Sequence, residues 1–180
     1  LASMGVYIFN GNFLFDQLAR DTADDSSSHD FGKDIIPYLV ERRASIYAHR
    51  FTESCVRSEP GAPAYWRDVG TIDAYWDANI DLTATVPLLD LYDKRWPIWT
   101  YQSQLPPAKF VHNQDDRRGL AIESPVSGGC IVSGAVFRSV LFSSVRVHSH
   151  ATVNWSVLLP DAWIGRGARL MRVIVDRGCV

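Results

Sequence analysis

The order of hydrophobic and polar segments in the first half of the chain is typical of an α/β layer. Apolar residues run together where a strand is expected and recur at three- and four-residue steps where a helix is expected. The expected elements are a strand at 4–9, a helix at 13–20, a polar loop at 21–28, a helix at 34–43 with Pro37 in its first turn, and a strand at 45–51.

A further helix is expected from Ile72 to Leu82. Its apolar stripe begins directly after Thr71, whose hydroxyl can cap the first turn, and Asp73 is favourable near the positive end of the helix dipole. Residues 87–121 lack long periodic runs. We expect a linker of extended segments there.

A sequence repeat begins at about Ile122. Apolar triplets at 140–142, 157–159 and 173–175 recur at spacings of 17 and then 16 residues. Further matches at 17 residues link Val147 to Ile164, Val153 to Leu170 and Val145 to Ala162. In a parallel β-helix each coil buries its inward apolar side chains on the next coil, with small or polar residues at the corners. The repeat therefore predicts a β-helix at 122–180.

The composition fits a globular chain and excludes several function classes. Of the 180 residues, 47% are hydrophobic and 21% are charged, and the formal net charge of -2 gives no general attraction for nucleic acid or an anionic membrane. No run approaches the roughly 20 apolar residues that a membrane helix needs. The three widely separated cysteines fit a reducing compartment. We expect a cytoplasmic protein with no nucleic-acid or membrane partner.

Asp68 is the main candidate for a metal-binding residue. It follows Arg67 at the end of an expected strand and precedes the turn into the helix, where α/β sheets place ligand-binding groups. A carboxylate there can hold Mg2+ against phosphate oxygens, because magnesium prefers one or two carboxylates plus substrate and water. The structural alternative is an ion pair with Arg67 or a helix N-cap role for Asp68.

A second set of residues has the chemistry of a sugar site. It combines two hydroxyls, one carboxylate and two aromatic rings, namely Ser3, Tyr7, Asp30, Phe31 and Trp66. The polar groups can bond the hydroxyls of a sugar, and a ring can cover its apolar face. Taken one at a time, each residue has a structural alternative as a core or cap residue.

The remaining candidates are weaker. His148 and His150 would share one face of a strand, a spacing that can bind a metal ion, but no third ligand is apparent. Arginines in or beside the repeat are expected to be solvated, although a few that converge could bind a phosphorylated small molecule. No order of residues typical of a Ser-His-Asp catalytic triad, no Walker sequence and no dinucleotide-binding glycine motif is visible. Hydrolase and P-loop functions therefore have no positive support.

Several strings, in order along the chain, closely resemble bacterial glucose-1-phosphate adenylyltransferase, also called ADP-glucose pyrophosphorylase. They are Leu1-Ala2-Ser3-Met4-Gly5-Val6-Tyr7-Ile8-Phe9, Ser28-His29-Asp30-Phe31-Gly32-Lys33-Asp34, Tyr65-Trp66-Arg67-Asp68-Val69-Gly70-Thr71, Leu105-Pro106-Pro107-Ala108-Lys109-Phe110 and Val126-Ser127-Gly128-Gly129-Cys130. The resemblance implies the C-terminal part of a Rossmann-like nucleotidyltransferase domain at 1–86, a linker at 87–121 and a left-handed parallel β-helix at 122–180.

The same resemblance implies an activity and site residues. The family transfers AMP from ATP to α-D-glucose 1-phosphate, releases pyrophosphate and supplies ADP-glucose for glycogen synthesis. By similarity, Asp68 would help to bind the catalytic Mg2+ ion, and Arg177 would bind phosphorylated allosteric effectors. The glucose 1-phosphate site would be lined by Ser3, Tyr7, Asp30, Phe31 and Trp66. The family also implies a homotetramer.

We expect the sequence to be an excerpt of a longer protein. In the family, the glycine-rich loop that holds the nucleotide, another metal-binding aspartate and a lysine for the sugar phosphate precede the residue that matches Leu1. The family's remaining β-helix coils follow the residue that matches Val180. The excerpt alone is therefore expected to be inactive.

Three other functions stay open at this stage. The chain could be a non-catalytic regulatory or oligomerisation module. It could be a hexapeptide-repeat acyltransferase, which would need a histidine at a coil boundary in a trimer. It could also belong to a sister sugar nucleotidyltransferase, although such enzymes should not share the strings at 28–34 and 65–71 together.

Overall fold

The computed structural model describes residues 3–54, 61, 64–95, 97–99, 101–114 and 116–180. The chain divides into two compact units, Leu1–Glu53 and Ser54–Val180, and each is described by itself. No helix among the described residues is long and apolar enough to cross a membrane.

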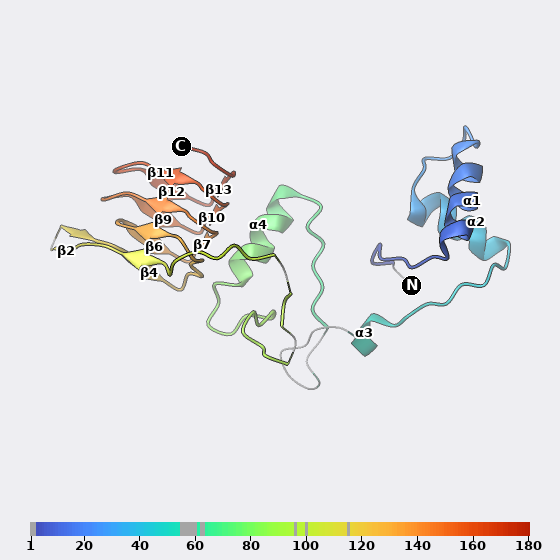
Figure 1. Ribbon diagram of the computed structural model, residues 1–180, viewed down its shortest axis with the longest axis horizontal. Helices are drawn as coiled ribbons and strands as arrows, with labels where there is room; N and C mark the ends of the chain where they lie inside the picture. Colours follow the sequence, from blue (N-terminus) through green and yellow to red (C-terminus); the bar gives the residue numbers. More distant parts are fainter. Residues whose placement is uncertain (1–2, 55–60, 62–63, 96, 100, 115) are drawn as a thin grey trace. The chain divides into compact units, whose positions relative to one another are not determined.

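The first unit is built from helices (Figure 1). Its elements are α1 (Gly11–Thr22), a π-helical turn η1 (Phe31–Ile35) that continues into α2 (Ile36–Glu41), and α3 (Phe51–Ser54), which ends one residue beyond it. The Asn10 side chain caps α1 by accepting a hydrogen bond from the Phe13 N–H. Ile35 and Leu39 are buried, and Pro37 lies in the first turn of α2, where its missing N–H costs nothing. The two helices expected at 13–20 and 34–43 are confirmed.

The strands expected at 4–9 and 45–51 are wrong. The described residues of this unit contain no strand, and Val6 and Ile8 are 82% and 99% exposed. An apolar run becomes a strand only when a neighbouring strand satisfies its backbone N–H and C=O groups, and no described segment of this unit supplies that neighbour.

The second unit begins with irregular chain and the helix α4 (Ile72–Asp81). Thr71 caps α4, because its hydroxyl oxygen accepts a hydrogen bond from the Ala74 N–H at 3.2 Å. This confirms the expected helix, its cap and the placement of Asp73 in its first turn. The described part of residues 82–108 consists of turns, bends and irregular chain and contains no helix or strand.

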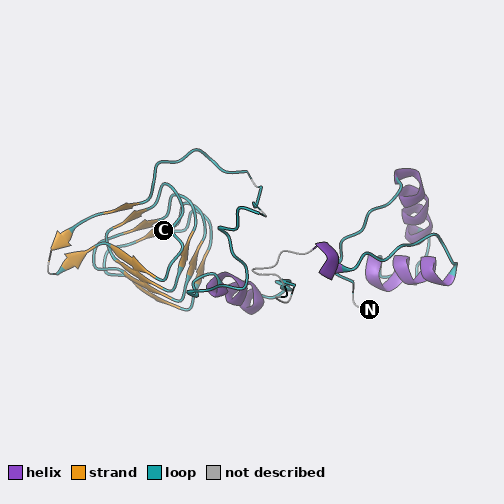
Figure 2. Ribbon diagram, turned by 90° about the horizontal axis from the view of Figure 1, so that it is seen from below, coloured by secondary structure: helices purple, strands orange, loops and turns teal. Residues whose placement is uncertain are grey.

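The rest of the second unit is a parallel β-helix, as the repeat predicts. Its strands are β1 (Lys109–Phe110), β2 (Asn113–Gln114), β3 (Arg117–Arg118), β4 (Leu120–Ile122), β5 (Ile131–Val132), β6 (Ala135–Phe137), β7 (Val140–Leu141), β8 (Arg146–Val147), β9 (Thr152–Asn154), β10 (Val157–Leu158), β11 (Trp163–Ile164), β12 (Arg169–Met171) and β13 (Ile174–Val175). Three stacks of these short strands form its faces, in the orders β1-β5-β8-β11, β13-β10-β7 and β12-β9-β6-β4, and an antiparallel pair β2-β3 projects from it. In Figure 2 the successive coils lie over one another.

Parallel pairing starts at Lys109, which pairs with Ile131, so the first strand lies within residues 87–121. The three-part division of the chain stays a prediction. Inward side chains of successive coils form one continuous apolar core, including Val132, Leu141 and Leu158, which are fully buried. Most of the stability of this unit comes from that burial.

From Ala135 onward, paired residues of successive coils are 17 positions apart, which corrects one of the expected spacings. Val140 pairs with Val157 as expected, but Val157 pairs with Ile174 and not with Val173. Buried serines explain the difference. Ser139 Oγ accepts a hydrogen bond from the Ser156 N–H, and Ser156 Oγ accepts one from the Val173 N–H. Val173 therefore occupies the corner position that Ser139 and Ser156 occupy in the preceding coils. Because residues 173–175 are all apolar, the sequence pattern does not reveal this shift of one residue.

Candidate functional site

Four of the five residues expected at a sugar site belong to the first unit, and the structure brings them together. The hydroxyl oxygens of Ser3 and Tyr7 lie 2.8 Å apart in a hydrogen bond. The Tyr7 ring stacks on the Phe31 ring, with centroids 5.7 Å apart and 22° between their planes. A methyl group placed on Gly32 would lie 3.3 Å from Asp30 Oδ1 and 3.9 Å from the Tyr7 hydroxyl, so both oxygens border this glycine. We call Ser3, Tyr7, Asp30 and Phe31 the N-terminal cluster.

The backbone at Asp30 explains its position in the N-terminal cluster. Asp30 is the N-cap of η1, and its Oδ1 accepts hydrogen bonds from the Gly32 and Lys33 N–H groups, both at 2.8 Å. The structural alternative for Asp30, a cap, is therefore confirmed. Among the described residues no hydrogen bond reaches Asp30 Oδ2, and the residue is exposed. One carboxylate oxygen holds the chain, and the other is open to a ligand.

A third aromatic ring, that of Phe9, lies beside the N-terminal cluster and is not among the candidates from the sequence. Its centroid lies 6.3 Å from that of Tyr7 and 5.8 Å from that of Phe31, with both pairs tilted. The spacing of two positions between Tyr7 and Phe9 places both rings on one face of an extended segment. That signal was present in the sequence.

Trp66 and Asp68 belong to the second unit, so the structure describes them apart from the N-terminal cluster. Residues 64–70 have no regular structure, and the strand expected before Asp68 is wrong. Trp66 is 51% exposed. Asp68 is also exposed, and its Oδ1 accepts a hydrogen bond from the Gly70 N–H at 3.0 Å. This bond fixes the turn that leads into α4.

Both structural alternatives for Asp68 are wrong. The guanidinium group of Arg67 forms an ion pair with Asp81, near the end of α4. The N-cap of α4 is Thr71. The Asp68 carboxylate therefore engages only a turn N–H among the described residues, and its charge is not neutralised by a neighbouring cation.

The Asp68 carboxylate is chemically suited to serve as one ligand of a magnesium ion. The described residues contain no group of three or more His, Cys, Asp or Glu side chains that could hold a metal. Magnesium does not need such a cage, because it binds through one or two carboxylates and completes its shell with water and substrate phosphate. An exposed carboxylate with a free oxygen meets that requirement.

The turn of Asp68 is anchored to the β-helix through α4. The indole N–H of Trp76 donates a hydrogen bond to the Trp155 carbonyl at 2.8 Å, and the Arg172 guanidinium lies over the Trp76 ring, 4.5 Å from its centroid. An open pocket of ≈ 510 Å³ lies beside the N-terminal end of α4, lined by Val69, Gly70, Thr71, Ile72, Tyr75 and Ile174. The β-helix thus supports the position of the carboxylate.

The other candidates do not form a site among the described residues. The His148 ring stacks on Trp163 with centroids 4.9 Å apart, and no third metal ligand accompanies His148 and His150. Arg177 is exposed and lies 3.5 Å from Asp161 in an ion pair. A role for Arg177 in effector binding stays a prediction. Cys55 lies outside the described residues.

Two family models match the chain. "Nucleotidyl transferase" matches residues 1–85, and "GlmU-like, C-terminal hexapeptide" matches residues 106–180. The second match agrees with the parallel β-helix.

Curated relatives match along the whole chain. A glucose-1-phosphate adenylyltransferase of Nitrosospira multiformis is 60% identical in a match 181 positions long that covers 100% of this chain and 42% of the relative. Relatives of the same name from Albidiferax ferrireducens and Bradyrhizobium diazoefficiens are 62% and 61% identical over 99% of this chain and 42% of their own length. The chain thus spans less than half the length of the curated relatives it matches.

Proposed function

Because this chain belongs to the glucose-1-phosphate adenylyltransferase family, we propose that it forms part of an enzyme that converts ATP and α-D-glucose 1-phosphate to ADP-glucose and pyrophosphate. The observation that carries the proposal is the identity of about 60% over the whole chain with enzymes of that name. The geometry of the N-terminal cluster supports it, because hydroxyl, carboxylate and aromatic groups meet there as a sugar site requires.

The N-terminal cluster would hold the glucose moiety. The open oxygen of Asp30 can accept hydrogen bonds from sugar hydroxyls, while the hydroxyls of Ser3 and Tyr7 can both donate and accept. Tyr7 and Phe31 are half-buried, and the exposed parts of their rings can cover the apolar face of the sugar. Trp66, which is exposed, would add a further ring in the complete site.

Asp68 would supply one carboxylate ligand to Mg2+. When bound, the ion neutralises charge on phosphate oxygens and helps to orient them. The chain contributes a carboxylate whose turn is already fixed by the Gly70 N–H and by the anchoring of α4. A ligand that is positioned before the reaction needs little reorganisation during it.

The reaction itself asks mainly for positioning. A phosphate oxygen of glucose 1-phosphate attacks the α-phosphorus of ATP, and the bond from that phosphorus to the bridging oxygen of pyrophosphate breaks. Holding the sugar phosphate in line with this bond turns an encounter of two molecules into one ordered step. The N-terminal cluster would provide that orientation on the sugar side.

The β-helix would serve assembly and regulation in this proposal. ADP-glucose would be used for glycogen synthesis, and the enzyme would be a homotetramer that responds to phosphorylated effectors. Arg177 is suited to bind such an effector, because it is exposed and an arginine can form paired hydrogen bonds with a phosphate group.

The proposed activity is tested by measuring pyrophosphate release in a full-length protein that carries this chain. With ATP, glucose 1-phosphate and magnesium we expect release of pyrophosphate and formation of ADP-glucose, and stimulation by a sugar-phosphate activator. A higher rate with UTP or dTTP would assign the chain to a sister nucleotidyltransferase. No release with any nucleotide would favour a regulatory or oligomerisation module.

A further inference from the structure

Asp21 is a buried carboxylate that the proposed reaction does not use. It lies in the last turn of α1 and is only 4% exposed. Both features are unfavourable, because the C-terminal end of a helix repels negative charge and burial of a carboxylate costs free energy unless it has partners. A carboxylate at such a place needs a specific set of contacts.

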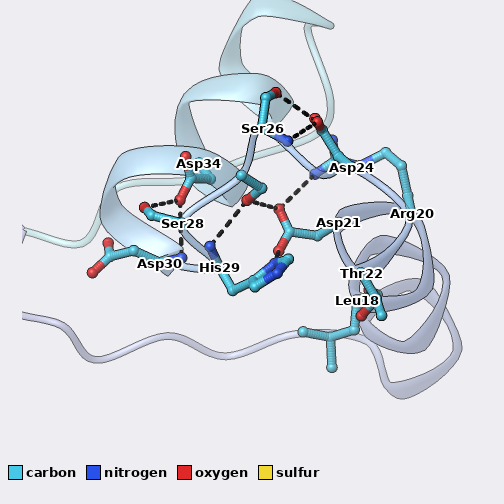
Figure 3. A network of polar contacts seen from close by, with 11 residues as sticks. Leu18, Arg20, Asp21, Thr22, Asp24, Ser26, Ser28, His29, Asp30 and Asp34 are labelled. Atoms are coloured by element: carbon cyan, nitrogen blue, oxygen red, sulfur yellow. Dashed lines mark hydrogen bonds and ion pairs between the residues drawn. The ribbon is translucent and has the colours of Figure 1, made fainter.

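Those contacts tie the end of α1 to the following loop (Figure 3). Ser27 Oγ donates a hydrogen bond to Asp21 Oδ1 at 2.8 Å, and His29 Nδ1 lies 2.9 Å from Asp21 Oδ2. The same Ser27 oxygen accepts a hydrogen bond from the His29 N–H at 3.0 Å. The Arg20 guanidinium is 3.9 Å from Asp21 Oδ1. Asp21, Ser27 and His29 thus form a closed ring of hydrogen bonds, which we call the Asp21 ring.

The Asp21 ring holds His29 in an unusual backbone conformation. His29 has a φ of 59°, in the left-handed region of backbone conformation that residues other than glycine rarely adopt. Such a conformation persists only where its surroundings fix it. Here both the backbone N–H and the imidazole of His29 are held, and the chain is turned at the residue before Asp30.

The position of Asp30 depends directly on that turn. Its backbone N–H donates to Asp34 Oδ2 at 3.0 Å, and Ser28 Oγ donates to the same oxygen at 2.6 Å. Its own side chain caps η1, as described above. The residues on both sides of the 29–30 peptide bond are therefore fixed, from α1 on one side and from η1 on the other.

We propose that Asp21 and His29 are positioning residues for the sugar-phosphate site, acting through the backbone at Asp30 and Phe31. The inference rests on the proposed function, because it takes the N-terminal cluster to bind glucose 1-phosphate. Neither residue needs to touch the substrate. Loss of the Asp21 ring releases the left-handed turn, and Asp30 and the Phe31 ring then sample positions that bind the sugar less well.

The test uses Asp21→Asn in a full-length enzyme that carries this chain. An amide of the same size has a single acceptor oxygen, so it can accept at most one of the two hydrogen bonds that the carboxylate shares with Ser27 and His29. We expect the KM for glucose 1-phosphate to rise about tenfold, as the loss of one buried hydrogen bond would give, and the KM for ATP to stay within about twofold.

Two further variants separate positioning from folding. Asp24→Asn is the matched control, because Asp24 lies in the same loop, is exposed, and its side chain forms hydrogen bonds only with Ser26 among the described residues. Its KM values should not change. His29→Asn removes the imidazole but keeps a residue that tolerates the left-handed region, so it should raise the same KM if Asp21→Asn does not fold. The double variant should be no worse than the more affected single variant, since both changes break one ring.

Each outcome decides the inference. A selective rise in the KM for glucose 1-phosphate, shared by both single variants and absent from Asp24→Asn, supports it. Unchanged KM values, or equal rises for both substrates with a lower Tm, overturn it and leave the Asp21 ring as a stabilising contact. An Asp30→Asn variant identifies the cause of a negative result. If Asp30→Asn weakens the binding of glucose 1-phosphate and Asp21→Asn does not, only the inference fails. If the unaltered enzyme forms no ADP-glucose, the proposed function fails with it.

Discussion

Replacing Asp68 with asparagine removes one negative charge from the turn before α4 and keeps the turn's hydrogen bond. The amide oxygen of the introduced side chain can still accept from the Gly70 N–H, which lies 3.0 Å from Asp68 Oδ1. Thr71 still caps α4, and Trp76 still anchors it to the β-helix. The substitution therefore tests the charge and not the shape of the turn.

The expected effects on stability and on rate differ in size. Asp68 is exposed and is not part of an ion pair among the described residues, so the free energy of unfolding should change by less than about 0.5 kcal/mol. A neutral amide is a poor ligand for Mg2+, and weaker binding of the ion would leave less positive charge to offset the phosphate oxygens in the transition state. We expect turnover to fall at least tenfold, equivalent to about 1.4 kcal/mol of transition-state stabilisation.

The assay is pyrophosphate release by the full-length enzyme at saturating ATP, glucose 1-phosphate and magnesium. Asp73→Asn is the matched control, because Asp73 is an exposed carboxylate in the first turn of the same helix. It changes the net charge equally and should leave turnover within about twofold. An unchanged rate for Asp68→Asn, or an equal loss for both variants, would refute the role of Asp68 as a metal ligand.

Three further predictions concern the fold and its ionisable groups. Ser139→Ala should lower the free energy of unfolding by about 1–3 kcal/mol in denaturant titrations, because the Ser156 N–H loses its buried acceptor; a change below about 0.5 kcal/mol would contradict this. Burial raises the pKa of the Cys130 thiol, so alkylation mapped by mass spectrometry should modify exposed Cys179 first, and Cys130 only after unfolding; equal labelling of both in the folded protein would be the opposite result. Hydrogen bonds from the Ser28 hydroxyl and the Asp30 N–H lower the pKa of Asp34. Its contribution to stability is thus present above about pH 4 and is lost as the pH falls through the lowered pKa, and an NMR titration that gave an ordinary or raised pKa for Asp34 would exclude it.

The helices were predictable because their signals are local. Thr71 and the apolar stripe from Ile72 identify α4 without any knowledge of the rest of the chain. The strands expected at 4–9 and 45–51 depend instead on partners elsewhere, and the described residues of their unit provide none. Apolar patterning alone therefore could not decide their structure.

The β-helix was predictable as an architecture but not to the residue. Its repeat is visible because every coil places apolar side chains inward at nearly constant spacing. The one-residue shift at Val173 is set by hydrogen bonds that the Ser139 and Ser156 hydroxyl oxygens accept from backbone N–H groups of the next coil, which no apolar pattern reports. Register required the three-dimensional contacts.

The candidate site was predictable in its residue types and less so in its supports. The structure brings Ser3, Tyr7, Asp30 and Phe31 together within one unit. It also reveals the buried Asp21, which neither periodicity nor composition marks. From the sequence alone, a charged residue at the end of a helix is predicted to be exposed to solvent, and only the structure reveals its burial and its partners.

The most direct measurement is a crystal structure of the full-length enzyme with glucose 1-phosphate bound. We expect the glucose ring to lie against Tyr7 and Phe31, with a sugar hydroxyl within hydrogen-bond distance of the Asp30 carboxylate. A sugar phosphate bound at full occupancy elsewhere, with these three side chains facing only solvent, would contradict it.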